Sequence, residues 1–218
     1  MNNSELKKVI DILKKEVKKW KPPAVGEIAK NSQDPYRILI SCLLSLRTKD
    51  RVTRDASMKL FSYADEPRLM LKLSTAKIRK AIYPVGFYRR KADTIKTISK
   101  TLIEKYDEIV PDDIDELLKL PGVGRKTANL VVTVAYKKPG VCVDTHVHRI
   151  VNRWGYVKTK TPYETEMALR EKLPRRYWII LNDLLVTFGQ NLCRPVSPKC
   201  NICKIYKLCL FYKMHSRK

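Results

Sequence analysis

The sequence has none of the long apolar stretches that a membrane span or a secretion signal requires. No apolar run approaches the roughly 18 residues that cross a bilayer. Residues 5–20, ELKKVIDILKKEVKKW, carry lysines among their apolar positions, whereas a signal peptide has an unbroken apolar stretch. We therefore expect no membrane partner and a cytosolic or nuclear location, in which the six cysteines are not expected to form a disulfide framework.

Acidic residues are scarce beside basic ones. The chain has 22 of them against 45 lysines and arginines, so its formal net charge is +23. A chain this basic repels itself, and we interpret the excess as a surface for a polyanion. The alternative is a lysine-rich surface that serves solubility alone. Hydrophobic residues make up 44% of the 218, which argues against a disordered chain and provides for a substantial core.

Glycine is rare and strand-like alternation is weak. The 7 glycines and 12 prolines lie mostly at segment ends, and the chain has no internal repeat or low-complexity tract. Between them, apolar residues recur at helical spacing. The clearest patterns cover residues 6–20, 36–46, 50–61, 67–72, 75–82, 88–106 and 112–119. The sequence predicts an all-α fold of about ten or more short helices, and the β-branched stretch 131–135 is assigned to one of them because it follows a helix start.

Three signals predict helix ends. Asp34-Pro35 predicts an N-cap followed by proline at the first helical position. Thr161-Pro162-Tyr163-Glu164 predicts a capping box, again with proline at the first helical position. Gly189 lies where a helix that begins near Arg175 would need a left-handed C-cap.

Two glycines one residue apart occur in LPGVGRK, residues 120–126, between two predicted helices. Such glycines permit a sharp turn, because a positive φ is open to either. The turn is expected to present N–H groups at the start of the next helix, where the helix dipole favours a phosphate. Without a base-reading side chain it would hold a nucleic-acid backbone regardless of sequence. The alternative is an ordinary corner between two helices.

Lys126 and Asp144 are the candidate catalytic residues. Lys126 is expected near other cations and a helix N-terminus, and both favour the neutral amine that a Schiff-base nucleophile needs. Asp144 precedes the predicted helix that begins THVHRI and is expected to cap it. From the residues alone, a solvated lysine and a plain N-cap are sufficient alternatives.

Four cysteines near the C-terminus form the pattern C-x6-C-x2-C-x5-C: Cys193, Cys200, Cys203 and Cys209. Four thiolates this close in sequence suit a tetrahedral zinc ion or an iron–sulfur cube. The wide first gap favours the larger cluster, because zinc sites more often show two C-x2-C pairs. Cys42 and Cys142 lie in apolar stretches and are expected in the core.

Taken in order, LPGVGRKTANLVVTVAY, VCVDTHVHRI and the cysteine pattern closely resemble the endonuclease III family of helix–hairpin–helix DNA glycosylases. GFYRRKADTI (86–95) and IVPDDIDELLKLPGVG (109–124) resemble it as well, so the resemblance covers nearly the whole chain. It implies two helical lobes: residues 25–138 as a six-helix barrel with the helix–hairpin–helix, and residues 1–24 plus 139–218 around a [4Fe–4S] cluster held by the four cysteines.

The resemblance also implies the activity. The expected function is base excision repair by a bifunctional glycosylase and abasic-site lyase, which flips oxidised pyrimidines out of duplex DNA. Lys126 matches the family's nucleophile at C1′, and Asp144 matches the aspartate that assists it, before β-elimination nicks the strand. The expected partner is double-stranded DNA with damaged pyrimidines or abasic sites, bound by a monomer at the nucleoid of a prokaryotic cytoplasm.

The residues expected to contact DNA are Arg47, Phe87, Leu120, Gly122, Val123, Gly124 and Arg125. Arg47 stands where the family usually has the glutamine that fills the gap left by the flipped base, and Phe87 stands at the opposing wedge position, usually leucine. Arg47 is expected to stack in that gap, with a phosphate contact as the alternative. A non-catalytic DNA-binding module and a cluster-bearing redox or sensing protein remain alternative functions.

Overall fold

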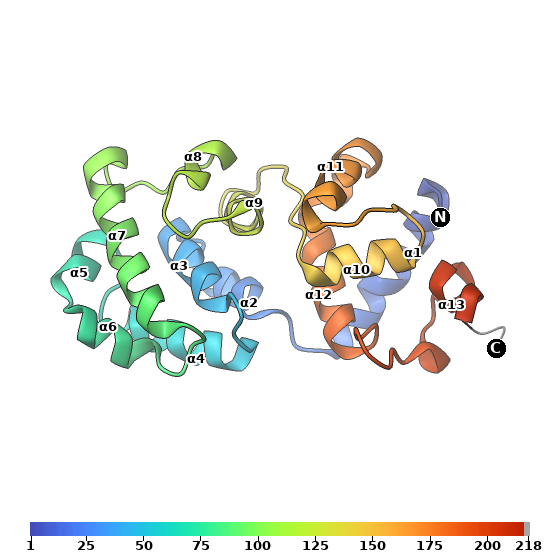
Figure 1. Cartoon of the computed structure of the whole chain (residues 1–218), viewed down its shortest axis with the longest axis horizontal. Coiled ribbons are helices and arrows are strands. Elements are labelled where there is room, and N and C mark those ends of the chain that lie inside the picture. Colours follow the sequence, from blue (N-terminus) through green and yellow to red (C-terminus); the bar gives the residue numbers. More distant parts are fainter. Residues whose placement is uncertain (216–218) are drawn as a thin grey trace. The chain divides into compact units, whose positions relative to one another are not determined.

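The computed structural model describes residues 1–215, and all regular structure in this part of the chain is helical (Figure 1). The chain divides into two compact units, one formed by Ala24–Gly140 and the other by Met1–Pro23 with Val141–Lys218. None of the helices among the described residues is both long and apolar enough to cross a membrane.

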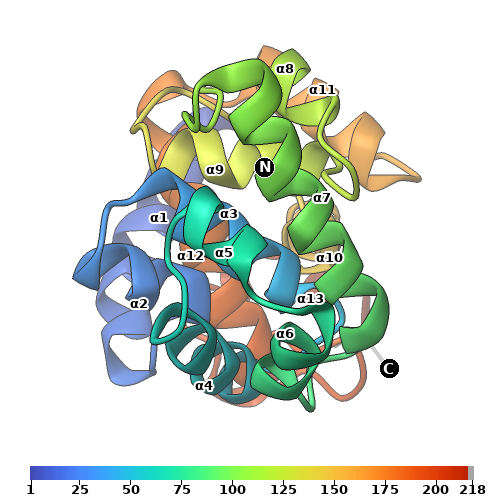
Figure 2. The ribbon, with the colours of Figure 1, turned by 90° about the vertical axis from the view of Figure 1, so that its left-hand side faces the viewer.

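The unit Ala24–Gly140 is built around a buried helix, α3. Its neighbours are α2, α4, α7 and α9, and nearly every residue of α3 is buried, which explains why its sequence is apolar on all sides. Helix α7 packs on α5 and α6, while α4 packs on α6 (Figure 2). The helices of this unit are α2 (Ala24–Asn31), α3 (Pro35–Ser45), α4 (Asp50–Phe61), α5 (Pro67–Lys72), α6 (Thr75–Ile82), α7 (Tyr88–Tyr106), α8 (Ile114–Leu118) and α9 (Arg125–Val134).

The second unit is discontinuous in sequence but has one core. Helix α1 contributes Leu6, Val9, Ile10 and Leu13 to it, and these residues lie with the fully buried Trp154 in one apolar cluster. Helix α12 packs against both α1 and α10. The α-helices are α1 (Asn3–Glu16), α10 (Thr145–Arg153), α11 (Pro162–Lys172), α12 (Trp178–Asn191) and α13 (Leu210–His215); short 3-10 turns cover Val17–Lys19, Arg175–Tyr177, Cys200–Ile202 and Tyr206–Leu208.

Two of the three predicted helix ends are confirmed at their N-caps. The Asp34 carboxylate accepts a hydrogen bond from the Arg37 N–H at 2.7 Å, with Pro35 at the first helical position. The Thr161 hydroxyl accepts from the Glu164 N–H at 3.2 Å. The second hydrogen bond of the predicted capping box, from the N–H of Thr161 to Glu164, is wrong. The Glu164 carboxylate accepts from the N–H of Lys160 instead.

The prediction that Gly189 is a C-cap is wrong. Gly189 lies inside α12, which continues to Asn191 and ends at the C-cap Leu192. A Cβ placed on Gly189 would lie 2.5 Å from His146 Nδ1 and 3.0 Å from Arg149 Nη2 of α10. Its small size therefore serves the close approach of two helices rather than a backbone conformation.

Candidate functional site

The hairpin of residues 120–124 connects α8 to α9. Leu120 and Val123 are buried, so they anchor the turn and can present only backbone to a ligand. Gly122 adopts a positive φ of 74°, which residues with a side chain rarely adopt. Gly124 is extended, and a Cβ placed on it meets nothing within 4 Å. Only Gly122 is thus required for its φ, while Gly124 leaves open space before α9.

The start of α9 has the features of an anion site. Its N-cap is Gly124, which has no side chain to accept from the N–H groups of the first turn, and the half-buried Arg125 is its first residue. The positive end of the helix dipole and the Arg125 charge therefore lie beside two exposed glycines. This arrangement suits a backbone phosphate, as the sequence predicted for the hairpin.

Lys126 is the second residue of α9 and is half-buried. It lies close enough to Cys42 of α3 to act electrostatically on its thiol. Burial raises the pKa of Cys42 to about 12, and the Lys126 charge opposes that rise. Cys42 is therefore a core residue, as expected, and the structure brings Lys126, Arg125 and the two hairpin glycines together at one helix start.

Asp144 belongs to the other unit, where it is the N-cap of α10. Its Oδ1 accepts hydrogen bonds from the N–H groups of His146 and Val147, each at 2.9 Å. The three residues before it, Val141–Val143, are buried and fix the chain that leads to the cap. The capping role predicted for Asp144 is confirmed, and its carboxylate is held in one orientation by two main-chain donors.

Arg47 and Phe87 form an exposed pair in the unit Ala24–Gly140; we call them the wedge pair. Arg47 follows the end of α3, Phe87 is the N-cap of α7, and the guanidinium carbon lies 5.7 Å from the centre of the phenyl ring. Phe87 is 62% exposed, whereas Phe61 and Phe188 are buried. The structure thus brings together two residues that are 40 positions apart and that the sequence assigned to the same task.

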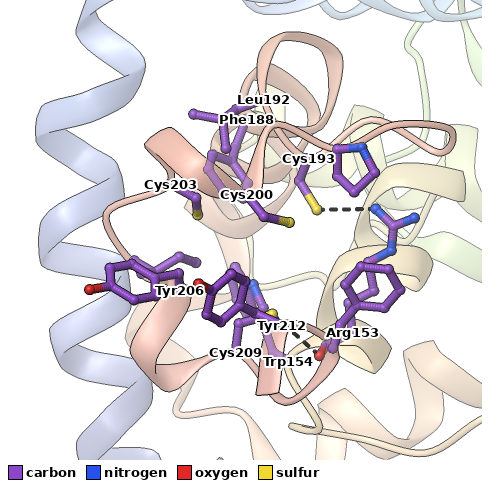
Figure 3. Close-up of a pocket in the computed structure, with 13 residues that line it drawn as sticks. Arg153, Trp154, Phe188, Leu192, Cys193, Cys200, Cys203, Tyr206, Cys209 and Tyr212 are labelled. Carbon is purple, nitrogen blue, oxygen red and sulfur yellow. Dashed lines mark hydrogen bonds between the residues drawn. The ribbon is translucent and has the colours of Figure 1, made fainter. Parts of the chain in front are cut away.

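All four cysteines of the C-x6-C-x2-C-x5-C pattern line one pocket of the second unit (Figure 3). The pocket has an empty volume of about 330 Å³, counting its part open to solvent, and its walls include Trp154, Phe188 and Tyr212. Burial raises the pKa of the Cys203 thiol to about 11 and also raises the pKa values of Cys200 and Cys209. Among residues 1–215, no three His, Cys, Asp or Glu side chains are close enough to bind a single metal ion.

Two arginines of α10 hold the first cysteine of this pocket, and sequence analysis did not single them out. Arg153 Nη1 donates to Cys193 Sγ at 3.4 Å, a contact drawn in Figure 3. Arg149 Nη2 donates to the Cys193 carbonyl oxygen at 2.9 Å. The four-residue spacing of the two arginines on a helix was a signal that they share a face. What they contact was not readable, because Cys193 lies 40 residues further along the chain.

A buried cation, Lys91 of α7, was also missed. It is 9% exposed and lines the same pocket as the wedge pair. The available signal was its position four residues before Ile95, on the helix face that Ile98 and Leu102 continue into the core. A lysine on an apolar helix face needs a buried partner, and the sequence does not say which.

Comparison with known proteins identifies the family. The pattern shared by HhH-GPD superfamily base excision DNA repair proteins matches residues 40–175. Endonuclease III of Thermotoga maritima is 49% identical over 184 residues, which are 84% of this chain and 86% of that protein.

Solved structures agree with this assignment. A trapped covalent endonuclease III–DNA intermediate superposes with a TM-score of 0.79 at 36% identity, over 84% of this chain and 87% of that one. A thermostable thymine-DNA glycosylase gives 0.75 at 26% identity, over 94% and 99%. With its all-helical fold and its hairpin, the chain therefore belongs to the HhH-GPD superfamily of base excision DNA repair proteins, and within that superfamily to the endonuclease III family.

Proposed function

We propose that this member of the family is a bifunctional DNA glycosylase and abasic-site lyase that excises oxidised pyrimidines from duplex DNA. The observation that carries the proposal is the position of Lys126, an amine two residues past the hairpin at the start of α9. A hairpin that holds the DNA backbone would bring this amine to the sugar of a nucleotide that has left the stack.

The proposed reaction uses the amine of Lys126 in its neutral form. Its nitrogen attacks C1′ of the damaged nucleotide, the bond from C1′ to the base breaks, and the base leaves with a proton from solvent. The Asp144 carboxylate is proposed to assist this attack and to stabilise the positive charge that develops on the sugar, while the proton that the attacking nitrogen loses passes to solvent. The two N–H groups that hold its Oδ1 orient it for this work.

Strand cleavage follows from the same covalent bond. Opening of the sugar ring gives a Schiff base between Lys126 and C1′, which makes the proton on C2′ acidic. Loss of that proton expels the 3′ phosphate by β-elimination, and water then hydrolyses the Schiff base to release the amine. The trapped covalent intermediate described for an endonuclease III that is 36% identical supports a covalent step of this kind.

DNA binding would use two features of the unit Ala24–Gly140, together with the charge of the whole chain. The N–H groups at the hairpin glycines and at the start of α9 bind a backbone phosphate. The wedge pair enters the stack where the damaged base has turned out, with the planar guanidinium of Arg47 stacked on neighbouring bases. The net charge of +23 supplies attraction that does not depend on sequence.

The four-cysteine pocket is proposed to hold a [4Fe–4S] cluster. Its donor set fits: four thiols face one space with apolar walls, and Arg153 donates to one of the sulfurs. The wide first gap of the C-x6-C-x2-C-x5-C pattern favours a cube, in which each thiolate binds a different iron, over a single zinc ion. Bound there, the cluster would cross-link residues 193–209; redox chemistry is not needed for the reaction above.

Borohydride trapping on abasic-site DNA tests the covalent step. The wild-type protein should give a stable protein–DNA adduct, and Lys126→Gln should give none while it still binds the duplex. Lys119→Gln, which removes an exposed lysine on the other side of the hairpin, is the matched control and should trap normally. An adduct with Lys126→Gln would contradict the assignment of the nucleophile, and base release without any trapping would indicate a glycosylase that lacks lyase activity.

A further inference from the structure

The ammonium group of Lys91 is buried and makes three hydrogen bonds to one short segment. It donates to the carbonyl oxygens of Leu44 at 2.9 Å and Leu46 at 2.6 Å, and to Thr48 Oγ1 at 3.3 Å. The two carbonyls lie at the C-terminal end of α3, where a cation meets both unsatisfied acceptors and the negative end of the helix dipole. Lys91 therefore holds the α3–α4 loop, which carries Arg47, against α7.

Thr48 extends this contact to the loop that carries Phe87. Its Oγ1 accepts a hydrogen bond from the Gly86 N–H at 3.2 Å and lies 3.1 Å from the Leu46 carbonyl, to which it donates. A Cβ placed on Gly86 would lie 2.5 Å from the carbonyl oxygen of Arg47, so the two loops touch backbone to backbone. Glycine is required at position 86 for this approach.

Both residues of the wedge pair have left-handed backbone conformations. Arg47 has a φ of 51° and Phe87 a φ of 57°. Such conformations cost a non-glycine residue free energy and persist where the surroundings over-determine them, which happens most often at functional sites. The contacts of Lys91, Thr48 and Gly86 lie directly beside the two strained residues and supply that restraint.

We propose that Lys91 is a positioning residue that locks the two loops together, so that Arg47 and Phe87 enter the DNA stack as one preorganised wedge. This inference rests on the proposed base-flipping function. A wedge whose two side chains are already in place loses less conformational entropy when it enters DNA, and more of the binding free energy is left for turning the base out.

The electrostatic setting agrees with a functional rather than a stabilising role. Burial lowers the pKa of Lys91 to about 8, and the neighbours that line the same pocket include two further cations, Arg47 and Arg90. A desolvated ammonium costs free energy, whereas an apolar residue at the same place on α7 would simply extend its buried face. The hold that Lys91 has on the two loops accounts for the cost of burying its ammonium group.

Fluorescence of 2-aminopurine, placed opposite or beside a lesion, tests the lock without depending on turnover. Binding of the wild-type protein should raise the fluorescence, because the wedge unstacks the probe. At saturating protein, Lys91→Met should lose most of this rise, and excision of a paired damaged base should slow by about tenfold or more, about 1.4 kcal/mol. Cleavage at an abasic site, which has no base to extrude, should stay within about twofold.

Lys100→Met is the matched control, because it removes an exposed lysine from the same helix and should change none of these quantities.

If Lys91→Met folds poorly, Thr48→Val and Thr48→Ser repeat the test. Valine removes the bridging hydroxyl and should lose the fluorescence rise, while serine keeps the hydroxyl and should restore the rise. A full rise and normal excision in Lys91→Met and Thr48→Val would overturn the lock, as would equal losses on paired and abasic substrates. A wild-type protein that raises the fluorescence but releases no base would contradict the proposed function and leave the lock standing.

Discussion

At the scale of single residues, Asp144 combines a structural and a proposed catalytic role in one carboxylate. Asn caps helices about as well as Asp, so Asp144→Asn should leave the free energy of unfolding almost unchanged. It removes the negative charge, and turnover should fall by about 10² or more. Asp144→Ala should also lose the cap, at about 1 kcal/mol in denaturant unfolding. Full activity of Asp144→Asn would reduce the residue to a cap.

The two hairpin glycines should respond differently to the same substitution. Gly122→Ala places a side chain at a φ of 74° and 3.0 Å from Thr94 Cγ2, so it should destabilise the unit by about 1–3 kcal/mol. Gly124→Ala meets no atom within 4 Å and should cost about 1 kcal/mol or less. It should nevertheless weaken binding to any duplex, because its methyl group occupies the space in front of α9. Unchanged affinity of Gly124→Ala, measured by fluorescence anisotropy, would place the phosphate elsewhere.

Residue roles were predictable where their cause is local. The caps at Asp34, Thr161 and Asp144 follow from side chains that reach only two or three residues along the chain. The packing role of Gly189 was missed because the residue that leaves no room for a side chain there, His146, lies on another helix. Lys91 was missed for the same reason, since its acceptors are more than 40 residues away in sequence.

At the scale of elements, periodicity predicted the helices because each buries one face. The predicted segments 50–61, 67–72, 75–82 and 88–106 are helices α4 to α7. The pattern that runs to Trp20 is divided differently, because α1 ends at Glu16 and a 3-10 turn covers Val17–Lys19. Apolar spacing cannot separate these two kinds of turn, since both keep neighbouring residues on one face over so short a length.

The contact between α10 and α12 can be tested at Gly189. Alanine is a better helix former than glycine, so helix propensity alone predicts a gain of about 1 kcal/mol for Gly189→Ala. The 2.5 Å approach to His146 Nδ1 predicts the opposite, a loss of about 1–3 kcal/mol, because α12 and α10 would have to separate. Thermal unfolding decides between the two signs, and a stabilised variant would show that the helices adjust freely.

Helix α1 is joined to the cysteine segment by Glu16, which should make stability depend on pH. Hydrogen bonds from Lys204 and Lys19 hold the pKa of Glu16 below its ordinary value of 4.5. The stabilisation is present above that value and is lost as the pH falls through the lowered pKa. Glu16→Gln should cost about 1 kcal/mol at pH 7, and the difference from wild type should disappear in acid. The exposed Glu171→Gln serves as the control, and a difference that does not vary with pH would exclude the ion pair as its cause.

At the scale of the whole molecule, positive charge is expected to dominate DNA binding. With a formal net charge of +23, affinity for undamaged duplex should fall steeply with salt. For roughly six to ten phosphate contacts, log K against log[salt] should have a slope of about −5 to −9. Titrations at several salt concentrations measure it. A flat dependence would leave the excess charge as a property of solubility alone.

The discontinuous unit has a consequence for synthesis. Helix α1 leaves the ribosome before its partner α12, which begins only at Trp178. Translation at about 5–20 residues per second separates Glu16 from Trp178 by roughly ten to thirty seconds. During this interval the residues Ala24–Gly140 emerge as a complete unit, while the apolar face of α1 has not yet met the residues it packs against. We expect the lysines on the opposite face of α1 to keep the nascent chain dispersed until α12 has been synthesised.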